Sequence, residues 1–403
     1  MISQLFSKSS MQNSLSFAVQ AQQIVHGRLL PLLQRTANKP TAEGLDVYSL
    51  WQGFAMDTIS AYYLGLANST NFIENAEERE TFRKHFLMRT PYAAYMHELP
   101  WLMHKLSKMG LHVIPRAYHL AGHALESTVR QWYLKTTEFI KCNPKKLPED
   151  QGNEPLAFRT ILSGYDKQSR LESSELGEHV LKNPEPHLLA ELMDNLTAAY
   201  DTTGITMTYI SWQLSKDEEV QNRLRNQLRS LEKPLIIADN DEHRDVPEAK
   251  ILDSLPLLHA IIMETLRLHC PVLGGQPRIV CKTGVTIGRC PNIPLGTRVA
   301  ASAYVLHRNS TVFPRPEEWL PERWLDQNPA KLKEMENWFW AFSSGGRMCT
   351  GRSFALAELK LLVAAVYTNF QTEIVCDDGI EQMDGHTVGP RASSLWLRFS
   401  KAA

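Results

Sequence analysis

The 403-residue sequence contains few cysteines, and no two of them form a closely spaced pair. They are Cys142, Cys270, Cys281, Cys290, Cys349 and Cys376. Because C-x-x-C pairs and zinc-ligand spacings are absent, the sequence shows no signature of a redox dithiol or a zinc module. This usage is typical of a reducing compartment, and we expect five of the six thiols to be inert.

The sequence also lacks an excess of charge of either sign. Its 43 basic and 44 acidic residues give a formal net charge of −1. Nucleic-acid binding normally needs a basic domain or patch, so no nucleic acid is expected as a partner. Dinucleotide-binding and flavin-binding motifs are absent too, so chemistry of that kind would have to reside in another protein.

Long apolar runs are missing as well. Residues 1–13 are polar, and no later stretch is both long enough and apolar enough to cross a membrane. We therefore expect neither a signal peptide nor a spanning helix, which predicts a cytoplasmic protein or one that contacts a membrane only at its surface. The hydrophobic content of 43%, with 22% charged residues, is ordinary for a globular protein with a large core.

One cysteine has a distinctive setting. Cys349 lies near the end of a loop that begins at Phe342 and contains Gly345 and Gly351, and apolar periodicity predicts a helix over 353–370. A position just before a helix N-terminus favours a thiolate, because free N–H groups and the helix dipole stabilise negative charge. The glycines allow a flat ligand to approach the main chain. Such a thiolate could be a nucleophile, a redox thiol or a metal ligand.

The spacing around Cys349 selects among these possibilities. A phosphatase-type loop has glycine three and arginine six residues after the cysteine, whereas Gly351 and Arg352 follow by two and three. A cysteine considered alone is more often a buried structural thiol. The pattern Phe-x-x-Gly-x-Arg-x-Cys-x-Gly, however, resembles the haem-ligand loop of the cytochrome P-450 (haem-thiolate monooxygenase) family. All its positions are filled, by Phe342, Gly345, Arg347, Cys349 and Gly351.

A second feature is a polar segment in the middle of the longest predicted helix, over 187–214. Residues 201–204, an aspartate, two threonines and a glycine, are poor choices for a buried helix interior. The threonines could bond back to helix carbonyls, or the helix could widen to hold oxygen and water. The family has an Ala/Gly-Gly-x-Asp/Glu-Thr-Thr/Ser signature on such a helix. The chain resembles it except for Ala199 in the usual glycine place, which would narrow the oxygen groove.

Charged residues further along fit the same family. Glu264 and Arg267 share one face of a predicted helix over 254–269, a pairing that is weak evidence alone. In order before Arg323, they resemble the family's buried ion-pair network, which braces the haem loop and performs no chemistry. Arg278 matches the family's donor to a haem propionate, and a solvated strand-end arginine is the competing interpretation.

The resemblance implies a mainly α fold with small β-sheets (α+β), and the periodicity of the sequence agrees. Further elements are predicted as helices over 14–33, 47–64, 77–86 and 115–140, short strands within 279–300 and 371–399, and an irregular polar stretch over 326–337. An aromatic, proline-interrupted stretch at 91–102 has two interpretations. It is either a packed connection or a lid or substrate entrance that touches a membrane surface.

The resemblance also predicts how these residues relate to the whole family fold. Residues 1–403 would form a single haem-thiolate domain that begins near the family's fourth long helix. The membrane anchor that usually holds the family at the endoplasmic reticulum, the first helices and the first sheet strands would be missing. Their loss would open one side of the haem pocket and expose a sheet edge.

For the proximal side of the cofactor, the resemblance implies that Cys349 is the thiolate ligand of a haem b iron. Arg347 and Arg278 would pair with the haem propionates through charge-assisted hydrogen bonds. Phe342 would shield the sulfur from water. The remaining cofactor-binding positions would be the loop glycines, Gly345 and Gly351.

On the distal side, the resemblance implies that Thr202 hydrogen-bonds dioxygen and that Asp201 supplies protons through water. The reaction would insert one oxygen atom from O2 into an apolar organic molecule, with electrons from NADPH delivered by a separate flavoprotein reductase. Pocket-lining candidates are Tyr200, Val272, Leu273 and the turn near Thr387. We hypothesise a substrate from specialised metabolism, such as a terpenoid, polyketide or alkaloid.

Two alternatives stay open. A haem-thiolate isomerase or dehydratase would use the same fold without O2 or a reductase, although such an enzyme has no need of the Asp201–Thr202 pair. The other alternative is a truncated, non-catalytic member of the family, which would bind haem weakly.

Overall fold

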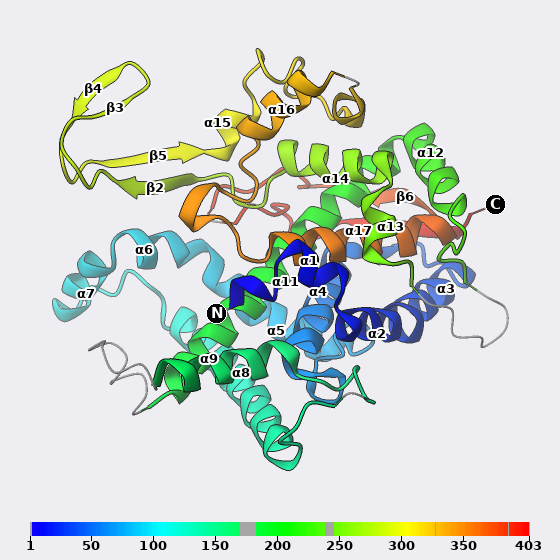
Figure 1. The fold of residues 1–403 in the computed structure, drawn as a ribbon, viewed down its shortest axis with the longest axis horizontal. Coiled ribbons are helices and arrows are strands. Elements are labelled where there is room, and N and C mark those ends of the chain that lie inside the picture. Colours follow the sequence, from blue (N-terminus) through cyan, green and yellow to red (C-terminus); the bar gives the residue numbers. More distant parts are fainter. Residues whose placement is uncertain are drawn as a thin grey trace.

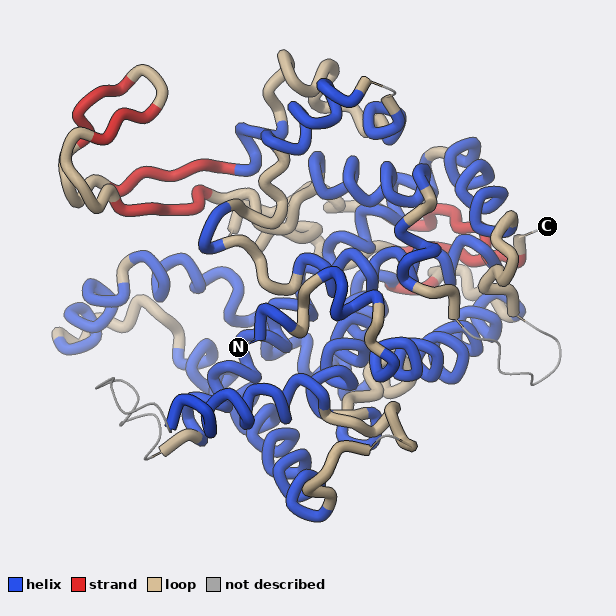
Figure 2. Tube along the Cα trace, in the orientation of Figure 1, coloured by secondary structure: helices blue, strands red, loops and turns tan. Residues whose placement is uncertain are grey.

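The computed structural model describes residues 2–147, 149–169, 183–237, 246–326, 328–385 and 387–402. Helices make up most of the described chain, and the few strands form small antiparallel sheets near its edges (Figure 2). The predicted fold class, mainly α with small β-sheets, is confirmed.

The longest described helix, α11 (Glu185–Lys216), packs lengthwise against α4 (Val47–Leu64). Every residue of α4 is buried, so this pair forms the middle of the protein. Gly204 permits their close approach, because a Cβ added there would lie 2.5 Å from Cγ of Gln52. The glycine that looked out of place in a buried helix therefore has a packing reason.

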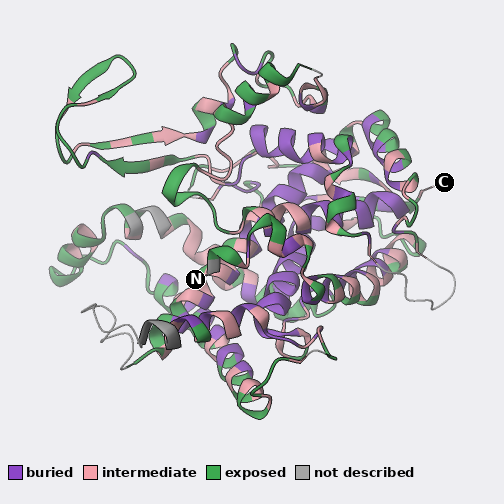
Figure 3. Ribbon diagram, viewed as in Figure 1, coloured by how far each residue is buried: buried purple, intermediate pink, exposed green. Residues whose placement is uncertain are grey.

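Helix α17 (Arg352–Asn369), which follows the cysteine loop, joins the same core from another side. Its apolar residues pack with those of α4, α11 and α14 (Pro256–Leu268). Near its start, Phe354 contributes to a second core cluster and meets the ring of Phe6 edge-on at 5.8 Å. Figure 3 shows that the buried residues concentrate in these central helices.

The N-terminal segment forms η1 (Ile2–Gln4), α1 (Lys8–Gln12), α2 (Leu15–Ile24), η2 (Val25–Leu29) and α3 (Leu30–Asn38). The single helix predicted over 14–33 is therefore divided, because η2 is a π-helical turn and Pro31 lies in the first turn of α3. Proline is tolerated there because that position has no intrahelical N–H bond to lose. The boundaries of the predicted helix over 47–64 agree with those of α4.

Residues 66–169 form η3 (Leu66–Asn68), α5 (Ala76–Arg89), η4 (Thr90–Tyr92), α6 (Ala93–Glu98), α7 (Pro100–Lys108), α8 (Arg116–Cys142) and α9 (Leu156–Ser169). Helices α6 and α7 project from the body (Figure 1). Trp101 is 59% exposed and Met109 is 73% exposed. Within residues 91–102, Tyr92 packs edge-on against Tyr118, whereas Tyr95, Leu99 and Trp101 are exposed, so the packed-connection interpretation holds only for part of the stretch.

The remaining helices are α12 (Glu218–Arg229), α13 (Ala249–Asp253), α15 (Ala303–His307), η5 (Pro321–Leu325), α16 (Pro329–Trp338) and η6 (Gly345–Arg347). The irregular stretch predicted over 326–337 is wrong, since most of it forms α16. Asn328 caps this helix by accepting hydrogen bonds from the N–H groups of Ala330 and Lys331. Pro329 follows in the first turn, a start signal that the sequence interpretation overlooked.

Strands β1 (Leu45–Asp46), β7 (Trp396–Lys401) and β6 (Phe370–Cys376) form one antiparallel sheet in that order. Strand β2 (Gly275–Ile279) pairs with β5 (Arg298–Ser302), and β3 (Val285–Ile287) pairs with β4 (Cys290–Ile293). These last two pairs project as an exposed arm (Figures 1 and 3). Among the described helices, none combines the length and apolarity needed to span a membrane.

Candidate active site

The cysteine loop has a tightly specified backbone. Ser343 and Gly345 adopt positive φ angles of 61° and 71°. The N–H of Cys349 donates to the carbonyl of Phe342 at 2.9 Å, and the N–H of Met348 donates to Gly345 at 3.0 Å. The loop therefore closes on itself before α17 begins at Arg352, and residues 344–350 are left exposed.

The electrostatics of Cys349 differ from the sequence expectation. The N–H groups of Gly351 and Arg352 and the Arg352 guanidinium lower its pKa, as the helix-start argument predicts. Desolvation by the surrounding protein is larger, however, and the net pKa of this thiol is raised. The helix start therefore favours the thiolate, as the sequence predicts, while desolvation of the thiol acts against it.

A buried network lies behind the loop. Arg267 binds Glu264 through two hydrogen bonds, Nη2 to Oε1 at 2.8 Å and Nε to Oε2 at 2.9 Å. Arg323 Nε reaches the same Oε1 at 2.9 Å. Both Glu264 and Arg267 are fully buried. The structure thus brings together Glu264, Arg267 and Arg323, the three residues of the predicted ion-pair network, which we call the brace.

The brace also holds the chain around it. Glu264 accepts further hydrogen bonds from the N–H of Leu320 and from Nε1 of Trp324, each at 2.9 Å. Arg267 donates to the carbonyls of His307, Pro316 and Glu318, at 3.0, 2.7 and 2.9 Å. The network therefore fixes the segment that leads to α16 and the cysteine loop.

His307 links this brace to the loop, and the sequence interpretation missed it. Its Nδ1 lies 2.9 Å from the carbonyl oxygen of Arg267, and its Nε2 accepts from the N–H of Trp340 at 2.7 Å. This pairing requires a neutral ring with the proton on Nδ1. Burial lowers the pKa of His307 to about 3, which agrees with the geometry. Both partners are backbone groups, so no sequence motif marks the residue.

The cationic residues predicted at the cofactor lie near the loop. Arg278 on β2 donates from Nη2 to Oγ of Ser343 and to the carbonyl of Ser344, each at 3.4 Å. Arg347 is exposed. Phe342 is partly buried against the main core, with the Arg352 guanidinium 5.7 Å from its ring centroid.

The polar segment of α11 does not break the helix. Residues 185–216 are α-helical throughout, so the widening considered from the sequence does not occur in this described segment. The hydroxyl of Thr202 donates to the carbonyl of Ala198 at 2.9 Å, and that of Thr206 donates to Thr202 at 2.8 Å. Thr202 therefore bonds back to a helix carbonyl, whereas Thr203 donates to Glu358 at 3.1 Å.

Asp201 is 4% exposed. Its Oδ1 accepts hydrogen bonds from Nε2 of Gln52 at 3.1 Å and from the hydroxyl of Tyr48 at 3.5 Å. Burial raises the pKa of this carboxyl, while hydrogen bonds from Thr387, Gln52 and Tyr48 oppose the increase. A buried carboxyl with a raised pKa, at the wall of a pocket, is a candidate for proton transfer.

A second buried carboxyl escaped the sequence interpretation. Glu358 on α17 is fully buried and accepts a hydrogen bond from Thr203 at 3.1 Å. Burial raises its pKa well above the usual range, against hydrogen bonds from Thr203 and Thr58. We therefore assign it the neutral acid form. The available signal was a charged residue within the otherwise mainly apolar helix predicted over 353–370.

A pocket of about 900 Å³ lies beside the polar segment of α11. Asp201 and Thr202 line it together with Val272, Thr387 and residues of α5 and α8. Tyr200, another predicted lining residue, is instead fully buried, with its ring packed edge-on against those of Phe82 and Phe86.

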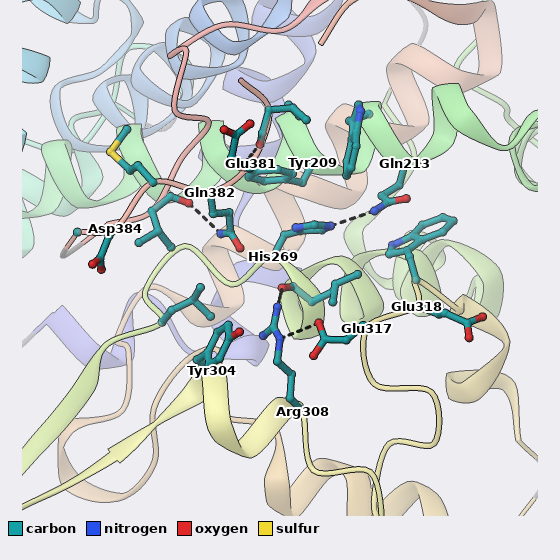
Figure 4. A pocket seen from close by; sticks show the side chains of 18 of the residues that line it. Tyr209, Gln213, His269, Tyr304, Arg308, Glu317, Glu318, Glu381, Gln382 and Asp384 are labelled. Atoms are coloured by element: carbon teal, nitrogen blue, oxygen red, sulfur yellow. Dashed lines mark hydrogen bonds and ion pairs between the residues drawn. The ribbon is translucent and has the colours of Figure 1, made fainter. Parts of the chain in front are cut away.

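Leu273 lines a different pocket, of about 1000 Å³, at the C-terminal half of α11 (Figure 4). Its wall contains His269, stacked on Tyr209 with centroids 4.4 Å apart. His269 shares a hydrogen bond with Gln213 at 2.9 Å, and burial lowers its pKa to about 3. The predicted lining residues are therefore divided between two pockets and the core.

The residues around Cys349 fit a haem group. Residues 344–350 are exposed, and a Cβ added at Gly345 or Gly346 would meet nothing within 4 Å, so space is open in front of the loop. One thiol, N–H groups directed at it and nearby arginines supply the donor set for a metal ion and anionic side groups.

The fold and this site define a class: a helical protein with an exposed loop thiol that is open to a cofactor, and with a carboxyl and a hydroxyl at the wall of a pocket. The family model described as "Cytochrome P450" matches residues 4–393. The chain belongs to the cytochrome P450 family. The family implies a haem group with thiolate ligation.

Curated relatives are fungal. The chain is 26% identical over 390 residues to "Cytochrome P450 monooxygenase FGM1" of Gibberella zeae, covering 94% of this chain and 70% of that protein. It is 33% identical to "Cytochrome P450 monooxygenase macH" of Penicillium terrestre, covering 83% and 61%. With "Cytochrome P450 monooxygenase avaI" of Aspergillus versicolor the identity is 35% and the coverage 44% of each. The chain thus spans less than two thirds of several relatives.

Proposed function

We propose that the protein is a haem-dependent monooxygenase that inserts one oxygen atom from O2 into an apolar organic substrate. The observation that carries this proposal is the pocket of about 900 Å³, which is lined by both Asp201 and Thr202. Membership of the cytochrome P450 family supplies the cofactor chemistry.

On the proximal side, Cys349 would hold the iron, and Arg278 and Arg347 would pair with the propionates. A bound iron cation would stabilise the deprotonated sulfur of Cys349. Phe342 and the loop glycines, Gly345 and Gly351, form the surface beneath the cofactor. When bound, haem supplies the oxygen activation and the thiolate favours O–O cleavage.

On the distal side, Thr202 donates a hydrogen bond and Asp201 transfers protons. The Thr202 hydroxyl bonds to Ala198 in this structure and donates to an oxygen-containing ligand by rotating about χ1. Asp201 holds a proton at Oδ1 or Oδ2 and passes it through water in the pocket, since burial raises its pKa. These two residues perform the acid–base work.

The substrate proposal is an apolar molecule of specialised metabolism, such as a terpenoid, polyketide or alkaloid. The pocket offers apolar side chains including Phe86, Val129, Leu189 and Val272. A pocket of this volume accommodates a molecule of drug-like size.

Electrons come from NADPH through a separate flavoprotein reductase. Peripheral membrane contact is proposed for α6 and α7, which expose Tyr95, Leu99 and Trp101 in a projecting segment. An amphipathic segment with exposed aromatic residues is suited to a membrane interface.

The test is turnover of candidate apolar compounds by the purified, haem-loaded chain with a flavoprotein reductase, NADPH and isotopically labelled dioxygen. We expect one labelled oxygen atom in the product, and Asp201→Asn to reduce product formation by at least about tenfold. Product formation without NADPH or reductase would instead support an isomerase or dehydratase. A chain that folds but takes up no haem would support a non-catalytic protein.

A further inference from the structure

Asp201 is buried without a cation beside it. Within the described part of the chain, its side-chain hydrogen bonds come from the neutral groups of Gln52, Tyr48 and Thr387. A buried carboxylate normally requires a charged partner or several strong donors. One of these neutral groups also connects Asp201 to a more distant cation.

Gln52 provides that connection. It is fully buried on α4, and its Nε2 donates to Oδ1 of Asp201 at 3.1 Å. Its Oε1 accepts from Nε of Arg83 at 3.2 Å and from the hydroxyl of Tyr200 at 3.4 Å. The amide cannot rotate by 180°, because its oxygen would then face the carboxylate and its NH2 group would face the guanidinium. The two charged residues thus fix the orientation of Gln52.

Arg83 is itself held in place at the other end. It lies on α5 with its side chain 12% exposed, donating to Glu80 at 3.3 Å and to the carbonyl of Ser393. Its guanidinium also lies 5.4 Å from the ring centroid of Tyr48. A cation fixed by so many contacts polarises the amide between it and Asp201, which strengthens the N–H donated to the carboxylate.

We propose that Gln52 and Arg83 are positioning residues for Asp201, which hold its carboxyl in a defined orientation through a hydrogen-bonded chain from α11 through α4 to α5. These helices adjoin one another (Figure 1). Neither Gln52 nor Arg83 carries a proton to Asp201, because an amide and a guanidinium do not exchange protons readily at neutral pH. The inference rests on the proposed function only for the catalytic use of Asp201.

The chain also connects Asp201 to the substrate pocket. Helix α5 carries Arg83 and, one turn later, Phe86, which lines the pocket and packs against Tyr200 with ring centroids 5.3 Å apart. Tyr200 in turn donates to Gln52. A ligand that displaces Phe86 therefore acts on the same hydrogen-bonded chain that orients Asp201.

The direct test is titration of the Asp201 carboxyl by infrared difference spectroscopy of the purified chain, with Asp201→Asn as the reference that identifies its band. The other ionisable side chains near it, Tyr48, Tyr200, Arg79, Glu80 and Arg83, stay unchanged in this reference. Gln52→Leu removes the N–H donor and should raise the titration midpoint by about one pH unit or more. Arg83→Met should raise it by less, and Arg83→Lys should restore part of the difference.

Gln213→Leu is the control, because this glutamine lies on α11, as Asp201 does, but bonds to His269 and not to Asp201. In Gln213→Leu, the titration midpoint of the Asp201 carboxyl should equal that of the wild type. If Gln52 and Arg83 had purely structural roles, the Asp201 midpoint would also be unchanged in their variants. Should Gln52→Leu fail to fold, the two Arg83 variants decide the matter. An unchanged midpoint in Arg83→Met would overturn the proposal.

The titration needs no reductase, NADPH or substrate, so its result is separate from the proposed function. In a chain that turns over, Gln52→Leu and Arg83→Met should also lower the share of NADPH electrons recovered in product, with KM unchanged. Shifted midpoints in a chain without oxygenase activity would refute the proposed function but support the positioning role. Oxygenase activity with unshifted midpoints would refute the positioning role alone.

Discussion

Glu358 accepts a hydrogen bond from Thr203 at 3.1 Å, which joins the helix that follows the cysteine loop to the helix that carries Asp201 and Thr202. The contact places a neutral acid group at the junction of α17 and α11. It thereby couples the position of the proximal loop to that of the distal polar segment.

Glu358→Gln should change the pH dependence of stability. Burial raises the pKa of Glu358 well above its unfolded value, so its native form is favoured at low pH. The stability of the native state that comes from the neutral form of Glu358 is fully present below the unfolded pKa of 4.5, and it is lost as pH rises toward the folded pKa. The variant, which has no such loss, should gain up to ~1.4 kcal/mol over the wild type per pH unit above about 5.

Denaturant unfolding at pH 5 and pH 8 measures this difference. Glu373→Gln, at an exposed position on β6, serves as the control and should show no such trend. Parallel pH profiles for Glu358→Gln and the wild type would contradict a buried neutral acid.

His307 should make the protein sensitive to acid. Its pKa is lowered from 6.5 to about 3, so its stabilising contribution is present above pH 6.5 and is lost as pH falls toward 3. A protonated ring would place an N–H against the N–H of Trp340. Between pH 6.5 and 5, the wild type should lose about 2 kcal/mol more than His307→Gln in unfolding free energy.

The buried brace should tolerate no loss of a partner. Glu264→Gln leaves Arg267 and Arg323 without a counter-ion, and we expect it to cost about 3–5 kcal/mol and to prevent haem uptake. Arg315→Met is the control, because Arg315 forms an exposed pair with Glu318 at 3.1 Å. That pair should contribute no more than about 1 kcal/mol. Thermal unfolding and haem titration measure both variants; equal effects would refute the brace.

Gly204→Ala should destabilise the α4–α11 contact. The added Cβ would lie 2.5 Å from Cγ of Gln52 and 3.0 Å from its Cα, so the backbone of α4 must move. We expect a cost of about 1–3 kcal/mol. Gly27→Ala is a matched helical control with nothing within 4 Å of its Cβ, and it should be neutral or stabilising by up to ~1 kcal/mol.

Much of the fold followed from the sequence. Apolar periodicity gave both ends of α4 and placed α11 and α17 to within a few residues, because these helices bury broad faces. The π turn at η2 was missed, because apolar periodicity does not distinguish a π turn from an α-helical turn. Helix α16 was predictable from Asn328 and Pro329, and the signal was overlooked.

Some residues of the candidate site were likewise identified from the sequence, and others were missed. Residues in spaced motifs, such as Glu264, Arg267 and Arg323, were identified and lie together. His307 and Gln52 were missed, because their partners lie far away in the chain and only the tertiary fold brings them close. The desolvation that acts on the Cys349 thiol also depends on tertiary packing, which the local helix-start argument does not include.

The account rests most directly on Cys349 as the ligand of a haem iron. The decisive measurement is the carbon monoxide difference spectrum of the reduced, haem-loaded chain, compared with that of Cys349→Ala. We predict a thiolate-ligated haem band in the wild type and its loss in the variant, with the variant still folded by circular dichroism. Persistence of the band in Cys349→Ala, or its absence from a folded, haem-loaded wild type, would contradict the account.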